Sequence, residues 1–134
     1  MSLALDPEKI KGMLKEISAH TADIEGAALV SYDGMMIANA LHADSPSDMV
    51  AAMTATLLNL GKLCVDMLQR GEVEQVFIKC QNGYIVIGKA GERNVITLLA
   101  RRDAKIGILM NEIARTGEAL LKLEREAKKA AQTK

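Results

Sequence analysis

Apolar residues recur at helical spacing in three parts of the chain and form short strand-like runs between them. Asp6 and Pro7 mark a helix start, because aspartate caps an N-terminus and proline suits the first turn. Apolar residues then follow at three- and four-residue spacing and predict a helix over 7–19. The Ser-Pro-Ser-Asp run at 45–48 resembles a capping box and predicts the start of a second helix, which extends to about residue 70. A third helix is predicted after Asp103.

Five short apolar runs have the length and composition of strands. Asp33-Gly34 separates the first two and Asn82-Gly83 separates the third and fourth, and both pairs are typical of tight hairpin turns. Short links make neighbouring strands antiparallel. Apolar residues occupy consecutive positions in several runs, so both faces of the sheet need cover and helices should lie on both sides. The runs span residues 27–32, 35–40, 73–79, 84–90 and 95–100.

The second helix is apolar over an unusually wide arc. At about 100° per residue, its apolar side chains form two adjoining stripes that together span roughly 220°, about twice the stripe of an ordinary surface helix. A sheet can cover only part of that arc, which predicts a homodimer; the alternative is that loops cover the second stripe within one chain. Small residues beside the stripes would permit close approach of another protein. The first stripe holds Met49, Met53, Leu60, Cys64 and Met67, the second Val50, Leu57, Leu58, Val65 and Leu68, and the small residues are Ala51, Ala52 and Ala55.

Charge and composition argue against nucleic acid and membrane as partners. Lysine and arginine total 17 and so do aspartate and glutamate, so no field of one sign would attract phosphates, and only 2% of residues are aromatic. The longest uncharged apolar stretch, 49–61, is shorter than the roughly 20 residues that cross a bilayer. The N-terminus reaches acidic, helix-capping residues at once, so we expect no signal peptide and a cytoplasmic protein.

No catalytic, cofactor or metal site is expected. Residues 83–90 approach the P-loop pattern, but the intervening residues are strand formers and Ala90 lacks the hydroxyl that would hold magnesium. His20 and His42 have no partner motif. Cys64 and Cys80 lack metal-ligand spacing and are interpreted as reduced, free thiols.

Three segments together resemble the roadblock family of dynein light-chain type: IEGAALVSYDGMMIANAL, DMVAAMTATLLNLGKL and VFIKCQNGYIVIGKAGERNVITLLARRDAKIGILMNEI. The resemblance covers about residues 10–118. It implies an α+β, profilin- or longin-like fold: a five-stranded antiparallel sheet in the order 2-1-5-4-3, with the second helix on one face and the first and third on the other. One domain, 7–128, is expected, with a charged tail that frays over 129–134.

The resemblance also implies how the chain works. Roadblock proteins dimerise through the middle helix and third strand, and GTPase regulators among them contact the GTPase with the paired middle helices. The favoured function is therefore a homodimeric platform that binds and regulates a small Ras-like GTPase; a structural scaffold and, less strongly, a small-ligand sensor are the alternatives. The expected dimer interface comprises Met49, Val50, Met53, Leu57, Leu60, Cys64, Met67, Val76 and Ile78, and the expected GTPase contacts are Ala51, Ala55, Asn59 and Lys62.

Overall fold

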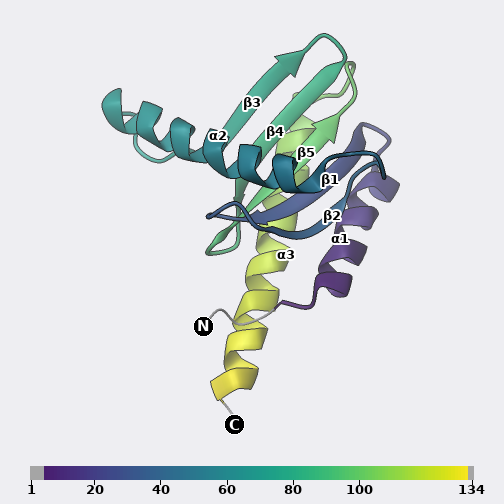
Figure 1. Ribbon diagram of the computed structural model, residues 1–134, viewed down its shortest axis with the longest axis vertical. Coiled ribbons are helices and arrows are strands. Elements are labelled where there is room, and N and C mark those ends of the chain that lie inside the picture. Colours follow the sequence, from purple (N-terminus) through teal and green to yellow (C-terminus); the bar gives the residue numbers. More distant parts are fainter. Residues whose placement is uncertain (1–4, 133–134) are drawn as a thin grey trace.

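The computed structural model describes residues 5–132 and has the element order αββαβββα (Figure 1). The three helices and five strands lie where the hydrophobic pattern predicts them. Their bounds are α1 Pro7–His20, β1 Ile24–Ser31, β2 Met36–Ala40, α2 Ser47–Met67, β3 Gln75–Cys80, β4 Gly83–Ala90, β5 Asn94–Ala100 and α3 Ile106–Gln132.

The five strands form one antiparallel sheet in the order β2-β1-β5-β4-β3, which confirms the predicted topology. β5 is the central strand, and β5 and its neighbour β1 are almost entirely buried. β3 is an edge strand that pairs only with β4, from Gln75 opposite Gly88 to Cys80 opposite Gly83. Its outer backbone groups therefore have no strand partner within residues 5–132.

Helices cover both faces of the sheet, as the doubly apolar strands require. α2 lies in front of the sheet in Figure 1, and α1 and α3 lie on the opposite face. The larger core cluster joins α1 and α3 to β1, β4 and β5, and includes Leu14, Leu98 and Leu109. On the other face, Thr54 of α2 and Thr97 of β5 are both fully buried and share a hydrogen bond of 2.8 Å. A satisfied polar pair at this depth holds α2 in one register over the sheet.

Two glycines in β4 permit contacts that a side chain would block. Gly83 has φ +148°, and a β-carbon there would lie 2.1 Å from the carbonyl oxygen of Ala100. A β-carbon on Gly88 would lie 3.0 Å from Ile113 Cγ2, so this glycine lets α3 pack directly on the strand. The second contact places α3 above β4 with its axis close to the sheet.

The ends of α2 and α3 differ from the predictions. Ser45 does not form the expected capping box, because Pro46 occupies the N-cap position and no side chain caps α2. α2 ends at Met67, before the predicted residue 70, and Gln69 adopts the left-handed φ of +54°. α3 continues to Gln132, so residues 129–132 are helical, and 133–134 lie outside the described residues.

Candidate interaction surface on α2 and β3

The inner face of α2 packs on the sheet while most of its apolar outer face is exposed. Leu58 on the inner face is 1% exposed. Met49, Leu60 and Met67, which share one stripe on the outer face, are 72%, 59% and 75% exposed. The wide apolar arc predicted from the sequence is therefore real: the stripe that holds Leu58 packs on the sheet, and no loop among the described residues covers the stripe that holds Met49, Leu60 and Met67.

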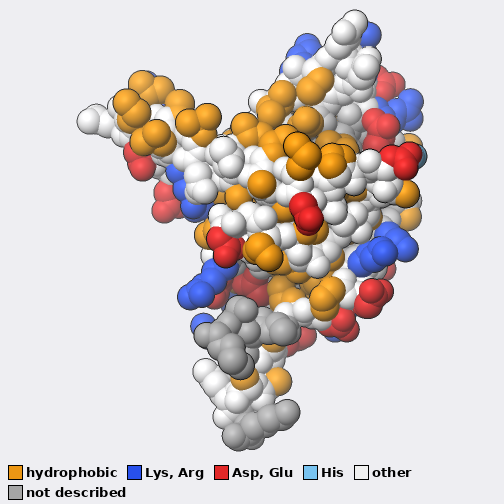
Figure 2. Space-filling model, in the orientation of Figure 1, with side chains coloured by type: hydrophobic (Ala, Val, Ile, Leu, Met, Phe, Trp, Pro, Cys, Tyr) orange, Lys and Arg blue, Asp and Glu red, His pale blue; other side chains and the backbone are white. Residues whose placement is uncertain are grey.

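The C-terminal part of α2 extends past the edge of the sheet (Figure 1). α2 crosses β3 at Gly61, where a β-carbon would lie 3.1 Å from Val76 Cγ2. Beyond that point Leu63 and Leu68 are 54% and 65% exposed. Figure 2 shows hydrophobic side chains gathered on this projecting end, with a notch between it and the part of the molecule that carries β3. We call the exposed apolar face of α2 and the free edge of β3 the pairing surface.

The expected dimer-interface residues all lie on the pairing surface or at its margin. Met49, Met53, Leu60, Cys64 and Met67 are exposed, while Val50, Leu57, Val76 and Ile78 are half-buried. Leu57 and Val76 pack at the edge of the cluster beneath α2. Cys64 and Cys80 are free thiols and both are exposed in the single chain.

The expectation that Ala51 and Ala55 are exposed contacts is wrong. Ala51 is 1% and Ala55 is 6% exposed, and both face the sheet and the β1–β2 turn. A β-carbon on Gly34 in that turn would lie 3.8 Å from the Ala55 side chain. Small side chains let the helix approach its own sheet here, so these alanines are part of the core.

Asn59 and Lys62, the other expected contacts, border the pairing surface. Asn59 is exposed, and Lys62 is half-buried with its Nζ 4.4 Å from the centroid of the Tyr32 ring. A cation in this position is attracted by the face of the ring. Burial raises the pKa of the Tyr32 phenol above its ordinary 10.0, and the negative charge of Glu124 adds to the rise. Tyr32 is therefore a neutral, partly buried support for Lys62 at neutral pH.

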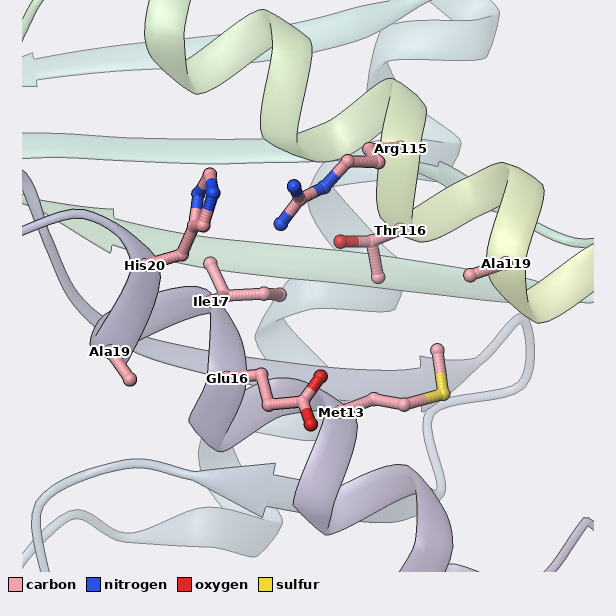
Figure 3. Close-up of a pocket in the computed structure, with 8 residues that line it drawn as sticks. All are labelled: Met13, Glu16, Ile17, Ala19, His20, Arg115, Thr116 and Ala119. Atoms are coloured by element: carbon pink, nitrogen blue, oxygen red, sulfur yellow. The ribbon is translucent and has the colours of Figure 1, made fainter.

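A groove of about 550 Å³, distinct from the pairing surface, lies between α1 and α3. Figure 3 shows His20 and Arg115 reaching into it from opposite walls. Both contact Glu112: His20 Nδ1 lies 3.1 Å from Oε1, and Arg115 Nη2 donates to Oε2 at 3.2 Å. The Glu112 side chain is 2% exposed, so its two partners satisfy a carboxylate that would otherwise be costly to bury.

Sequence reasoning missed this buried carboxylate. Glu112 lies within the apolar stripe of α3, between Leu109 and Ile113, and that position on a helical wheel was the available signal. Its partner His20 is 92 residues away, so the pair could not be recognised from a local motif.

Residues 83–90 form β4, as expected, and not a phosphate-binding loop. Within residues 5–132, no cluster of three or more histidine, cysteine, aspartate or glutamate side chains could hold a metal ion. By length and composition alone α2 could cross a membrane, but its inner face packs on the sheet, and core helices commonly pass that test.

Comparisons with known proteins agree with this architecture. Residues 11–100 match the Roadblock/LC7 domain, and the chain belongs to this family. A protein of Methanocaldococcus jannaschii is 24% identical over 100 residues, covering 75% of this chain and 87% of that protein. The gliding protein mglB of Thermus thermophilus is similar in structure, with TM-score 0.76 and 19% identity over 90% of this chain and 91% of that one. Profilin II of Acanthamoeba castellanii gives TM-score 0.63 and 13% identity over 83% and 95%, which confirms the profilin-like fold.

Proposed function

We propose that the chain is a homodimeric, cytoplasmic interaction platform that binds and regulates a small Ras-like GTPase. The observation that carries the proposal is the pairing surface: a free β-strand edge lies beside a helix whose apolar outer face is largely exposed. Large exposed apolar patches on small proteins usually mark interaction sites.

A second copy of the chain satisfies both halves of this surface at once. Two β3 edges can pair antiparallel about a two-fold axis, which joins the sheets and removes both free edges. The projecting ends of the two α2 helices then lie over the partner's sheet and against each other, and Leu60 and Met67 become buried.

The GTPase is assigned to the outer face of the paired α2 helices. The roadblock resemblance implies this role, because the family's gliding-motility regulator activates a Ras-like GTPase, and the fold of this chain is similar to that of a gliding protein. Asn59, Lys62 and Asp66 form the polar border of α2 that remains available in the proposed dimer. We propose that regulation reshapes the switch loops of the GTPase and that the platform donates no catalytic group, so its strength depends on differential affinity for the nucleotide states.

The proposal is tested by measuring binding to a small GTPase encoded beside this gene, loaded with GDP or a GTP analogue. We expect one nucleotide state to bind more tightly, and Asn59→Arg to weaken binding while leaving the dimer intact. Asn111→Arg is the matched control, since Asn111 is exposed on α3, on the opposite face of the sheet from α2. Equal affinity of both states and of both variants would contradict the assignment.

The first alternative is that the same dimer is a structural scaffold and binds no GTPase. Binding of an assembly subunit that is not a GTPase to the outer face of the paired α2 helices would favour this alternative. The groove between α1 and α3 is the feature that favours the small-ligand alternative. A metabolite that co-purifies with the chain and is lost on Arg115→Ala would support that alternative.

A further inference from the structure

A second exposed apolar strip lies on the opposite face of the sheet, beside β3. Phe77 pairs with Val86, and Val86 belongs to the core cluster under α3, so Phe77 points to the α3 side. Its side chain is nevertheless 38% exposed, because α3 lies over β4 and β5 and leaves β3 uncovered. Lys79 points to the same side, since it pairs with Tyr84, which packs on that cluster.

One flank of α3 extends this strip. Glu112 faces α1 through its contact with His20. At about 100° per residue, Ile106 and Met110 lie some 120° to 160° away from Glu112 around the helix, and therefore face β3. They are 47% and 41% exposed.

The strip and the flank lie at the same level. Ile113 and the Gln75 side chain both border Gly88, at 3.0 Å and 3.5 Å from the place of its missing β-carbon. Two residues along β3 span about 6.8 Å, and the three residues from Ile113 back to Met110 span about 4.5 Å. This puts Phe77 within about 2–3 Å of the level of Met110 along the sheet.

Pairing of two chains through β3 would place two such strips side by side. Strands lie about 4.8 Å apart, so two α3 helices, each between β4 and β5, would be separated by roughly four spacings or 19 Å. Helices in contact are about 8–10 Å apart, so the two α3 helices cannot cover the strip, whereas one further helix between them needs roughly 16–20 Å.

We propose that this strip, which rests on the proposed dimer, binds one amphipathic helix of a partner protein on the face opposite α2. Its floor is Phe77 from both copies and its walls are Ile106 and Met110. The floor and walls carry Lys79 from each copy and no carboxylate, so the bound helix has acidic residues beside its apolar face. The two-fold axis runs through the strip, so each dimer binds one helix and not two.

The probe is a fluorescein-labelled synthetic helix of about 18 residues, or some 27 Å, with leucines along one face and glutamates beside them. An otherwise identical peptide with lysines in place of the glutamates is the charge control. We expect saturable binding of one acidic peptide per dimer, and binding weaker by about tenfold or more for the basic peptide.

Met110→Lys should weaken binding of the acidic peptide by at least about tenfold. Ile108→Lys is the matched control: it makes the same change two residues away, at a side chain 36% exposed on the other flank of α3, and should leave binding unchanged. Sedimentation of each variant shows whether the dimer persists. This inference is overturned if the dimer persists but binds no peptide or binds two, or if both variants weaken peptide binding equally. Each of these results leaves the proposed function standing. A monomeric wild type would overturn both.

Discussion

Leu60→Asp is the sharpest test of the pairing surface, because the residue is peripheral to the single chain and central to the proposed dimer. Its side chain is 59% exposed and adjoins Gly61, where α2 crosses β3. Complete burial of a leucine contributes about 1.5–3 kcal/mol, so the exposed share is worth about 1–2 kcal/mol per copy and about 2–4 kcal/mol per dimer. Burying an unpaired carboxylate adds a cost of several kcal/mol.

We therefore expect Leu60→Asp to weaken dimerisation by at least about a thousandfold, since each 1.4 kcal/mol is a factor of ten. Sedimentation equilibrium should find the wild type at twice 14.5 kDa and the variant at 14.5 kDa. Far-ultraviolet circular dichroism should stay the same, because substitutions at exposed positions usually change stability by about 0.5 kcal/mol or less.

Two controls separate the interface from the fold. Met35→Asp makes the same kind of change at a side chain 66% exposed beside the opposite edge of the sheet, and should leave the dimer intact. Leu58→Asp places the charge at a position 1% exposed beneath α2 and should unfold the chain. A folded Leu60→Asp variant that sediments as a dimer would refute the reasoning.

Three further predictions follow from particular contacts. Cys64 and Cys80 should react slowly with iodoacetamide in the wild type and quickly in the monomeric variant; equal rates would place both thiols outside the interface. Tyr32 should titrate above 10.0 in the absorbance difference between the wild type and Tyr32→Phe. Because its pKa is raised in the fold, its contribution to stability is complete below pH 10.0 and is lost as the pH rises through the folded pKa; a midpoint at or below 10.0 contradicts this. Gly83→Ala should lower the free energy of unfolding by several kcal/mol through overlap with β5, whereas Gly12→Ala, with open space on α1, should raise it by about 0.5–1 kcal/mol in urea titrations; similar values for both would contradict the overlap.

The local hydrophobic pattern was sufficient to predict the helices and strands, but it did not correctly predict which side chains of α2 face the sheet. The Asp33-Gly34 turn and the apolar run of β4 are visible from neighbours in sequence. Alanine is compatible with both a buried and an exposed position, and the wheel of α2 wrongly placed Ala51 and Ala55 on the exposed edge. Their burial depends on how closely the β1–β2 turn approaches the helix, which no local spacing encodes.

The order of the strands and the second face of β3 required information of longer range. Hairpin lengths predict which consecutive strands pair, but the placement of β1 beside β5 came from the family resemblance and not from the residues. The exposure of Phe77 depends on α3 lying over β4 rather than β3, which in turn depends on Gly88. A strand that is apolar on both faces, as β3 is, predicts that other elements cover both faces. Here α2 covers one face of β3, and α3 leaves the other face exposed at Phe77.

The projecting end of α2 also sets how the protein would respond to its own abundance. In the proposed dimer, the surface that meets the GTPase is completed by two copies and does not exist on one. While the chain concentration is below the dissociation constant of the dimer, a twofold rise in expression would increase the completed surface about fourfold, by mass action. The same helix that holds the platform together would thus make its output depend steeply on how much of the protein the cell makes.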